Sequence, residues 1–307
     1  MDICVQSGGI ITRTNEEFCY ASIREAGFTT IDWNIDRNLK PADIKALTYA
    51  GKSVFERSFE EVWQHHQEEL AIIKKNGLTI SQAHAPFPAY VPGHPEVLEF
   101  MIGVYKNAIQ LCHHAGCKHL VIHGISLAVD DPINTPESIA ALNWHLYSSL
   151  IPTLLQCDVI VCLENLFTRH NGIVEGVCSD PHEAADLIDR LNAEAGREVF
   201  GFLLDIGHLQ LVNKNLRTYI PVIGKRLKAL HLHDNDGSDD QHLAPMTGKV
   251  NWQVLCDCLK DVGYTGDLSF ETFMQARIAM DFDMDLLVPW LTLIRQIGES
   301  MAKKIEN

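Results

Sequence analysis

Six short apolar runs in the chain each end on a residue that can carry charge or bind a metal. These residues are His84, His123, Glu164, Asp205, His233 and Glu271. A single carboxylate or histidine in such a place usually caps the next helix or lies in solvent. Six in succession need another explanation, because unpaired charge in apolar surroundings is costly and a bound cation compensates it. The pattern therefore favours a metal site over a purely structural network.

Four of these residues form the candidate metal-ligand set, which is Glu164, Asp205, His233 and Glu271. His231 shares a strand with His233; we expect only one of the two to point into the metal centre, and proximity to the following loop favours His233. Three carboxylates and one imidazole suit a hard or borderline ion, with Mn²⁺ as our first expectation and Mg²⁺, Co²⁺ or Zn²⁺ as alternatives. Glu164 and Glu271 are the candidate catalytic pair: one removes a C–H proton beside a metal-polarised carbonyl or hydroxyl, and another group returns it.

The elements that must position these residues repeat eight times as a short apolar run followed by a longer amphipathic stretch. The predicted strands are Ile3–Gln6, Thr30–Trp33, Thr79–His84, His119–His123, Val159–Glu164, Gly201–Asp205, Ala229–His233 and Leu268–Glu271. Between them lie helical patterns such as Phe59–Asn76 and Glu96–Ala115. Eight such units predict an α/β fold with a closed (β/α)8 TIM barrel, in one domain over residues 1–307. Catalytic residues of such a barrel project from the C-terminal ends of the strands.

Local signals support these boundaries. Thr135 and Asp180 each stand before a proline and an acidic first turn, which is typical of a helix start. Glycines close helices just before the next strand, at Gly27, Gly77, Gly116 and Gly263. The longest irregular stretch, Asp234–Asn251, follows a strand, so we expect it at the active face.

Composition excludes several classes of function. The chain of 307 residues has 25 basic and 40 acidic residues, and a net charge of -15 opposes binding to nucleic-acid phosphates. No apolar run is long enough for a membrane span, and the first residues resemble a strand more than a signal peptide. Nine scattered cysteines, including Cys256 and Cys258, lack metal-type spacing, so we expect buried thiols and a reducing cytoplasm.

In its most specific segments, the chain resembles the xylose-isomerase-like superfamily of barrels, also called sugar phosphate isomerases/epimerases or the apurinic endonuclease 2 family. These segments are 162–165 (Cys-Leu-Glu-Asn), 204–208 (Leu-Asp-Ile-Gly-His), 231–252 and 266–271. The resemblance runs from the first strand to the last helix and implies a sugar substrate. It also implies a possible homo-oligomer or partner subunit.

In the ketose 3-epimerases of this superfamily, Glu, Asp, His and Glu from strands five to eight hold one metal, and the two Glu residues are the acid–base pair. The resemblance carries those roles onto the four candidate ligands, and it makes His208 a substrate contact. The chain departs from the epimerases at His170 and Asp239, where they have a substrate-binding Glu and Arg. The residues expected to line the substrate site are His84, His123, His170, His208, Asp240 and His242.

Two other branches of chemistry remain open. Inosose dehydratases, keto-sugar lyases and the large subunit of C-glycoside-cleaving complexes would begin with the same proton abstraction and then eliminate. Endonuclease IV holds three zinc ions with nine ligands, whose types all occur here, in His84, His123, Glu164, Asp205, His208, His233, Asp240, His242 and Glu271. A shorter loop after His233, the acidic charge and the lack of an Arg/Lys cluster beside the strand ends oppose DNA binding. We therefore expect a small sugar as the partner, and neither nucleic acid nor membrane.

Overall fold

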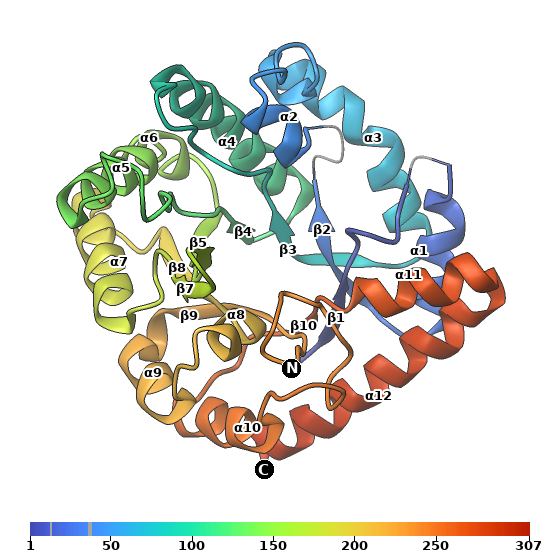
Figure 1. Ribbon diagram of the computed structural model, residues 1–307. Helices are drawn as coiled ribbons and strands as arrows, with labels where there is room; N and C mark the ends of the chain where they lie inside the picture. The colour runs from blue at the N-terminus through green and yellow to red at the C-terminus, as the bar shows by residue number, and fades with distance from the viewer. Residues whose placement is uncertain (13, 36–38) are drawn as a thin grey trace.

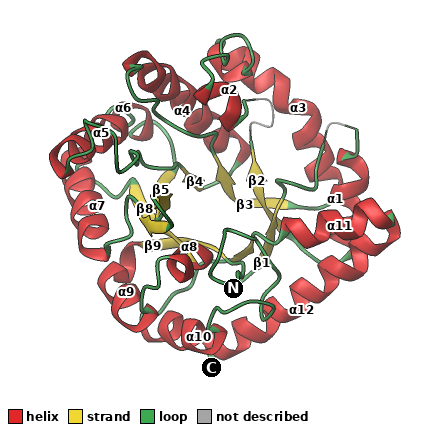
Figure 2. Ribbon diagram, viewed as in Figure 1, coloured by secondary structure: helices red, strands yellow, loops and turns green. Residues whose placement is uncertain are grey.

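The computed structural model describes residues 1–12, 14–35 and 39–307. Eight parallel strands occupy the centre in the order β10–β1–β2–β3–β4–β5–β8–β9, and helices surround them (Figure 1 and Figure 2). The strands are β1 (Ile3–Gln6), β2 (Thr30–Asn34), β3 (Thr79–His84), β4 (His119–Val121), β5 (Ile160–Glu164), β8 (Phe200–Asp205), β9 (Leu227–His231) and β10 (Leu268–Phe270). The predicted TIM barrel is confirmed.

The barrel closes between β9 and β10, just beyond the end of β9. Leu232 N donates to Ser269 O at 2.8 Å, and Glu271 N donates to Leu232 O at 3.1 Å. A parallel bridge joins Leu232 to Phe270. This contact brings Glu271 beside the residues that follow β9.

The outer helices follow the predicted pattern. The longer ones are α1 (Glu16–Glu25), α3 (Phe59–Lys75), α4 (Pro95–Ala115), α5 (Pro136–Ser148), α7 (Pro181–Ala195), α9 (Leu216–Ile223), α10 (Trp252–Asp261), α11 (Phe273–Phe282) and α12 (Leu287–Glu306). Shorter helical segments are α2 (Pro41–Lys45), α6 (Ile151–Leu154), α8 (Ile206–Leu211), η1 (Val54–Glu56), η2 (Gly224–Arg226) and η3 (Met284–Leu286). The Thr135 side chain caps α5 and that of Asp180 caps α7, as predicted, and Gly116 ends α4 at a φ of 77°. Among the described helices, none combines the length and apolar composition that a membrane crossing requires.

Apolar side chains fill two regions of the barrel. The larger lies between strands and helices, and the regularly spaced face of α4, including Met101 and Ala108, is buried there. The smaller lies inside the barrel and consists of Val121, Cys162, Leu203 and Ala229. All nine cysteines are free and buried, which confirms the expectation of buried thiols.

Two irregular segments follow strands at the end where the candidate site lies. A hairpin of β6 (Phe167–Arg169) and β7 (Ile173–Glu175), which the sequence pattern did not predict, follows β5. The segment after β9 is irregular as predicted, and Asp234 organises it. Asp234 accepts hydrogen bonds from Val250 N at 3.0 Å and Trp252 Nε1 at 2.9 Å, while its backbone pairs with Leu243. This loop thus has a defined path over the strand ends.

Candidate metal centre

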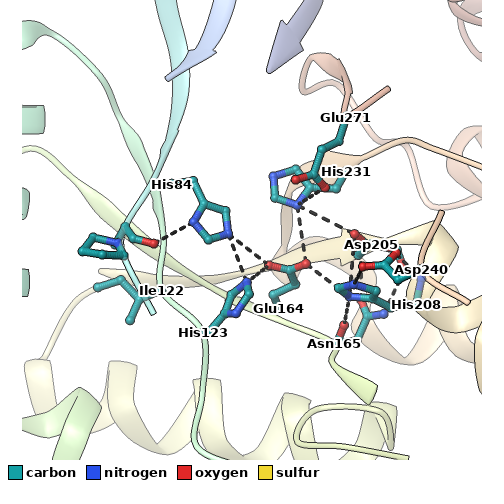
Figure 3. A network of polar contacts seen from close by, with 12 residues as sticks. His84, Ile122, His123, Glu164, Asn165, Asp205, His208, His231, Asp240 and Glu271 are labelled. Carbon is teal, nitrogen blue, oxygen red and sulfur yellow. Dashed lines mark hydrogen bonds and ion pairs between the residues drawn. The ribbon is translucent and has the colours of Figure 1, made fainter. Parts of the chain in front are cut away.

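Three carboxylates surround one imidazole nitrogen at the C-terminal end of the barrel (Figure 3). His231 Nδ1 lies 3.5 Å from Glu164 Oε1, 3.5 Å from Glu271 Oε2 and 3.9 Å from Asp205 Oδ2. The four residues come from the ends of β5, β8 and β9 and from the position just after β10. All four side chains are buried. Three predicted ligands therefore converge, around an imidazole that was not the predicted one.

The His231 Nδ1 atom has the properties of a metal ligand. It is buried and has no hydrogen-bond partner among the described residues. Burial by itself would lower the pKa of His231, but Glu271 and Glu164 outweigh it and hold that pKa well above its ordinary value. The surrounding carboxylates therefore favour a positive charge at this nitrogen, either a proton or a metal ion. The residues present fit a divalent metal with three oxygen ligands and one nitrogen ligand.

Asp32 fixes which nitrogen of His231 faces the carboxylates. His231 Nε2 donates to Asp32 Oδ2 at 3.1 Å, and the same oxygen accepts from Gln82 Nε2 at 2.9 Å and Ser269 Oγ at 3.1 Å. A carboxylate behind a ligating histidine sets its tautomer and orientation in many metal sites. Asp32 was not among the predicted site residues, although an aspartate within the apolar run of β2 was a usable signal.

The expectation that only one of His231 and His233 could point inward was wrong. Alternate residues of a strand share a face, so two histidines that are two positions apart point the same way. His233 lies one step further towards the loop, where its Nε2 is 3.0 Å from both oxygens of Asp205. Gly207 makes room for this ring, because a Cβ there would meet His233 Cε1 at 2.0 Å. Both imidazoles therefore approach Asp205, His233 at hydrogen-bond distance and His231 at 3.9 Å.

A second group of ligand atoms joins Glu164 on the side away from Asp205 (Figure 3). His123 Nε2 lies 2.9 Å from Glu164 Oε2, and His84 Nε2 lies 3.0 Å from His123 Nε2. His84 Nδ1 donates to Ala85 O at 2.7 Å, so its Nε2 can act as an acceptor or ligand. Burial, assisted by His123, lowers the pKa of His84 to about 4. This imidazole is therefore neutral near pH 7.

A third group surrounds Asp240 on the loop after β9. Asp240 Oδ2 accepts from His242 Nε2 at 3.1 Å and lies 3.5 Å from His208 Nε2. Burial alone would lower the pKa of His242, but Glu271 and Asp240 raise it to about 9. Burial likewise opposes charge on His208, yet Asp205 and Asp240 hold its pKa well above the ordinary value. Both histidines are therefore proton donors.

Gln6 and Asn165 hold two of the candidate ligand residues, Glu271 and Asp205, in place from neighbouring strands. Gln6 Nε2 donates to Glu271 Oε1 at 2.6 Å, which leaves Oε2 facing His231. The Asn165 side chain bonds both the N–H and the carbonyl of Asp205, at 2.9 and 2.8 Å. The sequence resemblance included Asn165 but gave it no role, and it did not single out Gln6.

Two residues at which the chain departs from the epimerase pattern lie further out. His170 is exposed in the turn between β6 and β7, and it belongs to none of the ligand groups found in the described chain. Asp239 forms an ion pair with Arg169, whose guanidinium lies 5.4 Å from the centre of the Phe167 ring. This pair links the hairpin after β5 to the loop after β9. His84, His123, His208, Asp240 and His242 do lie at the site, whereas His170 does not contact this network.

Residues 20–294 match the family described as the xylose isomerase-like TIM barrel. The chain belongs to this family. It is 27% identical over 269 residues to an uncharacterised protein of Sinorhizobium fredii, covering 82% of this chain and 79% of that protein. It is also 30% identical over 125 residues to a D-psicose 3-epimerase of Enterocloster bolteae, covering 41% of this chain and 37% of that enzyme.

Solved structures of sugar epimerases share the fold. A D-psicose 3-epimerase crystallised with D-fructose superposes with a TM-score of 0.70 at 13% identity, covering 98% of this chain and 99% of that one. A 3-keto-D-glucoside 4-epimerase of E. coli gives 0.66 at 16% identity, covering 96% and 99%. At these identities the likeness concerns the barrel architecture and not the substrate.

Proposed function

We propose that this protein is a divalent-metal-dependent sugar isomerase or epimerase that moves a proton beside a carbonyl group. The observation that supports this most is the convergence of Glu164, Asp205 and Glu271 on the unbonded Nδ1 of His231. The ligands that would hold the metal are therefore these three carboxylates and His231, in place of His233. Membership of the family and the printed activities of the epimerase relatives favour a sugar substrate.

A metal bound there would polarise the carbonyl and neighbouring hydroxyl of a keto-sugar and make the adjacent C–H more acidic. Glu164 and Glu271 are the acid–base pair that takes the proton and returns it. Each has one oxygen near His231 Nδ1 and the other held by the protein, by His123 and Gln6 respectively. Asp205 accepts from His208 N at 2.7 Å, is fully buried and has the role of a fixed ligand.

His208 and His242 would bind and orient the sugar. Their raised pKa values make each an N–H donor near neutral pH, and both lie at the mouth beside Asp240. Neutral His84 can accept a hydrogen bond from a hydroxyl, on the opposite side of Glu164. Donors on one side and an acceptor on the other would fix which carbon faces the two glutamates.

A lyase or a three-zinc nuclease would use the same residues differently. A leaving group on the next carbon would turn the same proton abstraction into elimination. The groups around His84 and His242, flanking the central one, favour a second candidate with further metal ions and a hydrolytic reaction. The net charge of -15 opposes an extended phosphate backbone as its substrate.

The test is a panel of keto-sugars incubated in D₂O with protein that has been stripped of metal and reloaded with Mn²⁺, Mg²⁺, Co²⁺ or Zn²⁺. We expect turnover only after reloading, with deuterium at the reacting carbon and one metal per chain at saturation. Product without deuterium would exclude the acid–base step. Three tightly bound zinc ions per chain with cleavage of abasic DNA would instead support the nuclease branch.

A further inference from the structure

A cavity lies between helices α5 and α7, outside the ring of strands (Figure 1). Its volume is about 730 Å³, within the range of small-molecule binding sites, roughly 300–1,000 Å³. The segment that follows β4 and the β6–β7 hairpin complete its walls. The apolar residues that line it include Leu127, Val129, Ile139, Trp144, Val177 and Leu187. We refer to this space as the α5–α7 cavity.

The strand β6 separates the α5–α7 cavity from the candidate metal centre. Successive side chains of a strand point to opposite faces. Phe167 on one face packs against His208, with the two ring centres 5.1 Å apart, and Thr168 on the other face lines the cavity. None of the candidate metal ligands lines the cavity. It is therefore a space distinct from the candidate site.

Hydrogen bonds hold the walls of the cavity in place. Val177 N donates to Ser126 Oγ at 2.9 Å, which ties the hairpin to the segment after β4. The Asn143 side chain on α5 accepts from Ile125 N at 2.8 Å and donates to Ile125 O at 2.9 Å. Gly124 leaves room for this contact, since a Cβ there would meet Asn143 Oδ1 at 2.8 Å. A cavity with fixed walls loses little freedom when a ligand enters, and this favours binding.

Carboxylates outnumber cations around the opening of the cavity. Its lining, which lies wholly in the described chain, includes the three carboxylates of Glu175, Glu183 and Asp186 and one guanidinium, that of Arg190. Asp186 pairs with Arg190 at 3.4 Å, and Glu175 pairs with Lys214 at 2.8 Å. The ion pairs of the described chain leave Glu183 without a cation. A ligand with a positive charge would supply the missing partner.

We propose that the α5–α7 cavity binds a small amphipathic cation, with an amine carried on a flat apolar body. The amine pairs with Glu183 at the opening, and the apolar body packs against Trp144 and Leu187. The floor of the cavity, at Cys178 and Ala184, is buried, so the occupant must reach inward from the surface, as a small molecule does. The proposal uses no residue of the candidate metal centre and is independent of the proposed function.

Isothermal titration calorimetry of the full chain with tryptamine tests the proposal. Indole-3-propionate and 3-methylindole carry the same ring with a negative charge and with no charge. Tryptamine should bind at one site per chain and at least about tenfold more tightly than indole-3-propionate, because a carboxylate without a cation attracts the one and repels the other. No binding of tryptamine, or equal affinity for the three compounds, overturns the proposal.

Matched variants on α5 and α7 locate the site. Ala140→Phe should abolish tryptamine binding by filling the opening, whereas Ala193→Phe, at an exposed position outside the cavity, should not change it. Glu183→Gln should weaken binding by up to about fivefold, the effect of an exposed ion pair, and Glu194→Gln should not weaken it. All four positions are exposed, so the circular dichroism spectrum of each variant should match that of the wild type.

Three outcomes of the variant series overturn the proposal. Wild-type affinity in Ale140→Phe would place the bound tryptamine elsewhere. Equal losses in Glu183→Gln and Glu194→Gln would indicate a diffuse attraction of cations to an acidic chain. A wild-type dimer in gel filtration that Ala140→Phe dissociates would show that a second copy occupies the cavity.

Discussion

Two layers of opposite character lie one above the other on four strands inside the barrel. The lower layer is apolar and consists of Val121, Cys162, Leu203 and Ala229. Two positions further along the chain from each of these stand His123, which follows the end of β4, and Glu164, Asp205 and His231, which end β5, β8 and β9. Alternate residues share a face of a strand, so the second set continues the first towards the mouth of the barrel. The same strands therefore supply both a closed core and a candidate catalytic layer.

The two layers differ in how completely the protein itself supplies packing and hydrogen-bond partners to their side chains. The lower layer is fully buried and contains only apolar side chains and a thiol, so its packing is complete within the protein. The upper layer buries two carboxylates, Glu164 and Asp205, and its His231 Nδ1 has no hydrogen-bond partner in the part of the chain that is described. Burying such groups without partners is costly. The lower layer serves stability, and the uncompensated groups of the upper layer support the proposal that it serves binding and chemistry.

The largest effect on turnover should come from Glu164, in the upper layer, and from Glu271, which follows β10 and faces the same His231 nitrogen. Glu164→Gln and Glu271→Gln should each lower kcat by about 10²- to 10⁴-fold, because each loses a proton-transfer group. The turnover of a substrate identified in the keto-sugar panel measures this. Glu194→Gln, on the exposed end of α7, should leave kcat unchanged. Near-normal activity of Glu271→Gln would refute the two-carboxylate mechanism.

Replacement of His231 and His233 one at a time tests which of the two histidines is the metal ligand. His231→Ala should weaken Mn²⁺ binding strongly, because it removes a ligand atom that faces three carboxylates. His233→Ala should weaken it less, since His233 lies towards the loop and contacts Asp205 alone among those carboxylates at hydrogen-bond distance. Equilibrium dialysis with Mn²⁺ compares the two. A larger loss of Mn²⁺ affinity in His233→Ala than in His231→Ala would identify His233 as the ligand instead.

The lower layer should respond in stability and not in metal binding. Leu203→Ala removes a fully buried side chain and should lower the free energy of unfolding by about 2–5 kcal/mol. Urea unfolding of the metal-free protein measures this loss. The number of metal ions bound per folded chain should stay the same. If Leu203→Ala lost its metal while remaining folded, the two layers would not be separable.

Asp32 on β2 accepts a hydrogen bond from His231 of the upper layer, and its replacement should have an intermediate effect. Asp32→Asn leaves the shape unchanged but weakens the hold on His231, and metal affinity should fall by about 10- to 100-fold. Calorimetric titration with Mn²⁺ measures the affinity, and Asp261→Asn on the surface is the control. Unchanged affinity in Asp32→Asn would mean that the packing of the ring alone orients His231.

The smallest effect is a pH dependence of metal binding. The pKa of His231 is raised in the metal-free protein, so this residue carries a proton near pH 7 that a metal must displace. Affinity should therefore rise with pH below that pKa, by about tenfold per pH unit for each proton released. Titration in buffers of different ionisation enthalpy counts those protons. Binding without proton release would show that His231 is not a ligand.

The repeating pattern of the sequence was sufficient for the fold and for most of the candidate site. Apolar runs at regular intervals predicted all eight strands within two residues at each end, because burial on both faces of a parallel sheet leaves a strong local signal. The position of ionisable residues at the strand ends located Glu164, Asp205 and Glu271, since parallel strands bring those ends together. Capping by Thr135 and Asp180 also depends on neighbours in sequence, and it was predicted correctly.

Only the tertiary structure decided which side chains face one another. A register shift between β8 and β9 at Phe202 and Leu203 sets Asp205 opposite His231, whereas an unshifted ladder would set it opposite Leu230. A similar shift after Ile31 sets Asp32 opposite Gln82. Such shifts depend on how the whole barrel twists and closes, and no local pattern encodes them. The sequence therefore determined which residues could do chemistry, and the closure of the barrel determined that His231, held by Asp32, stands among the three carboxylates.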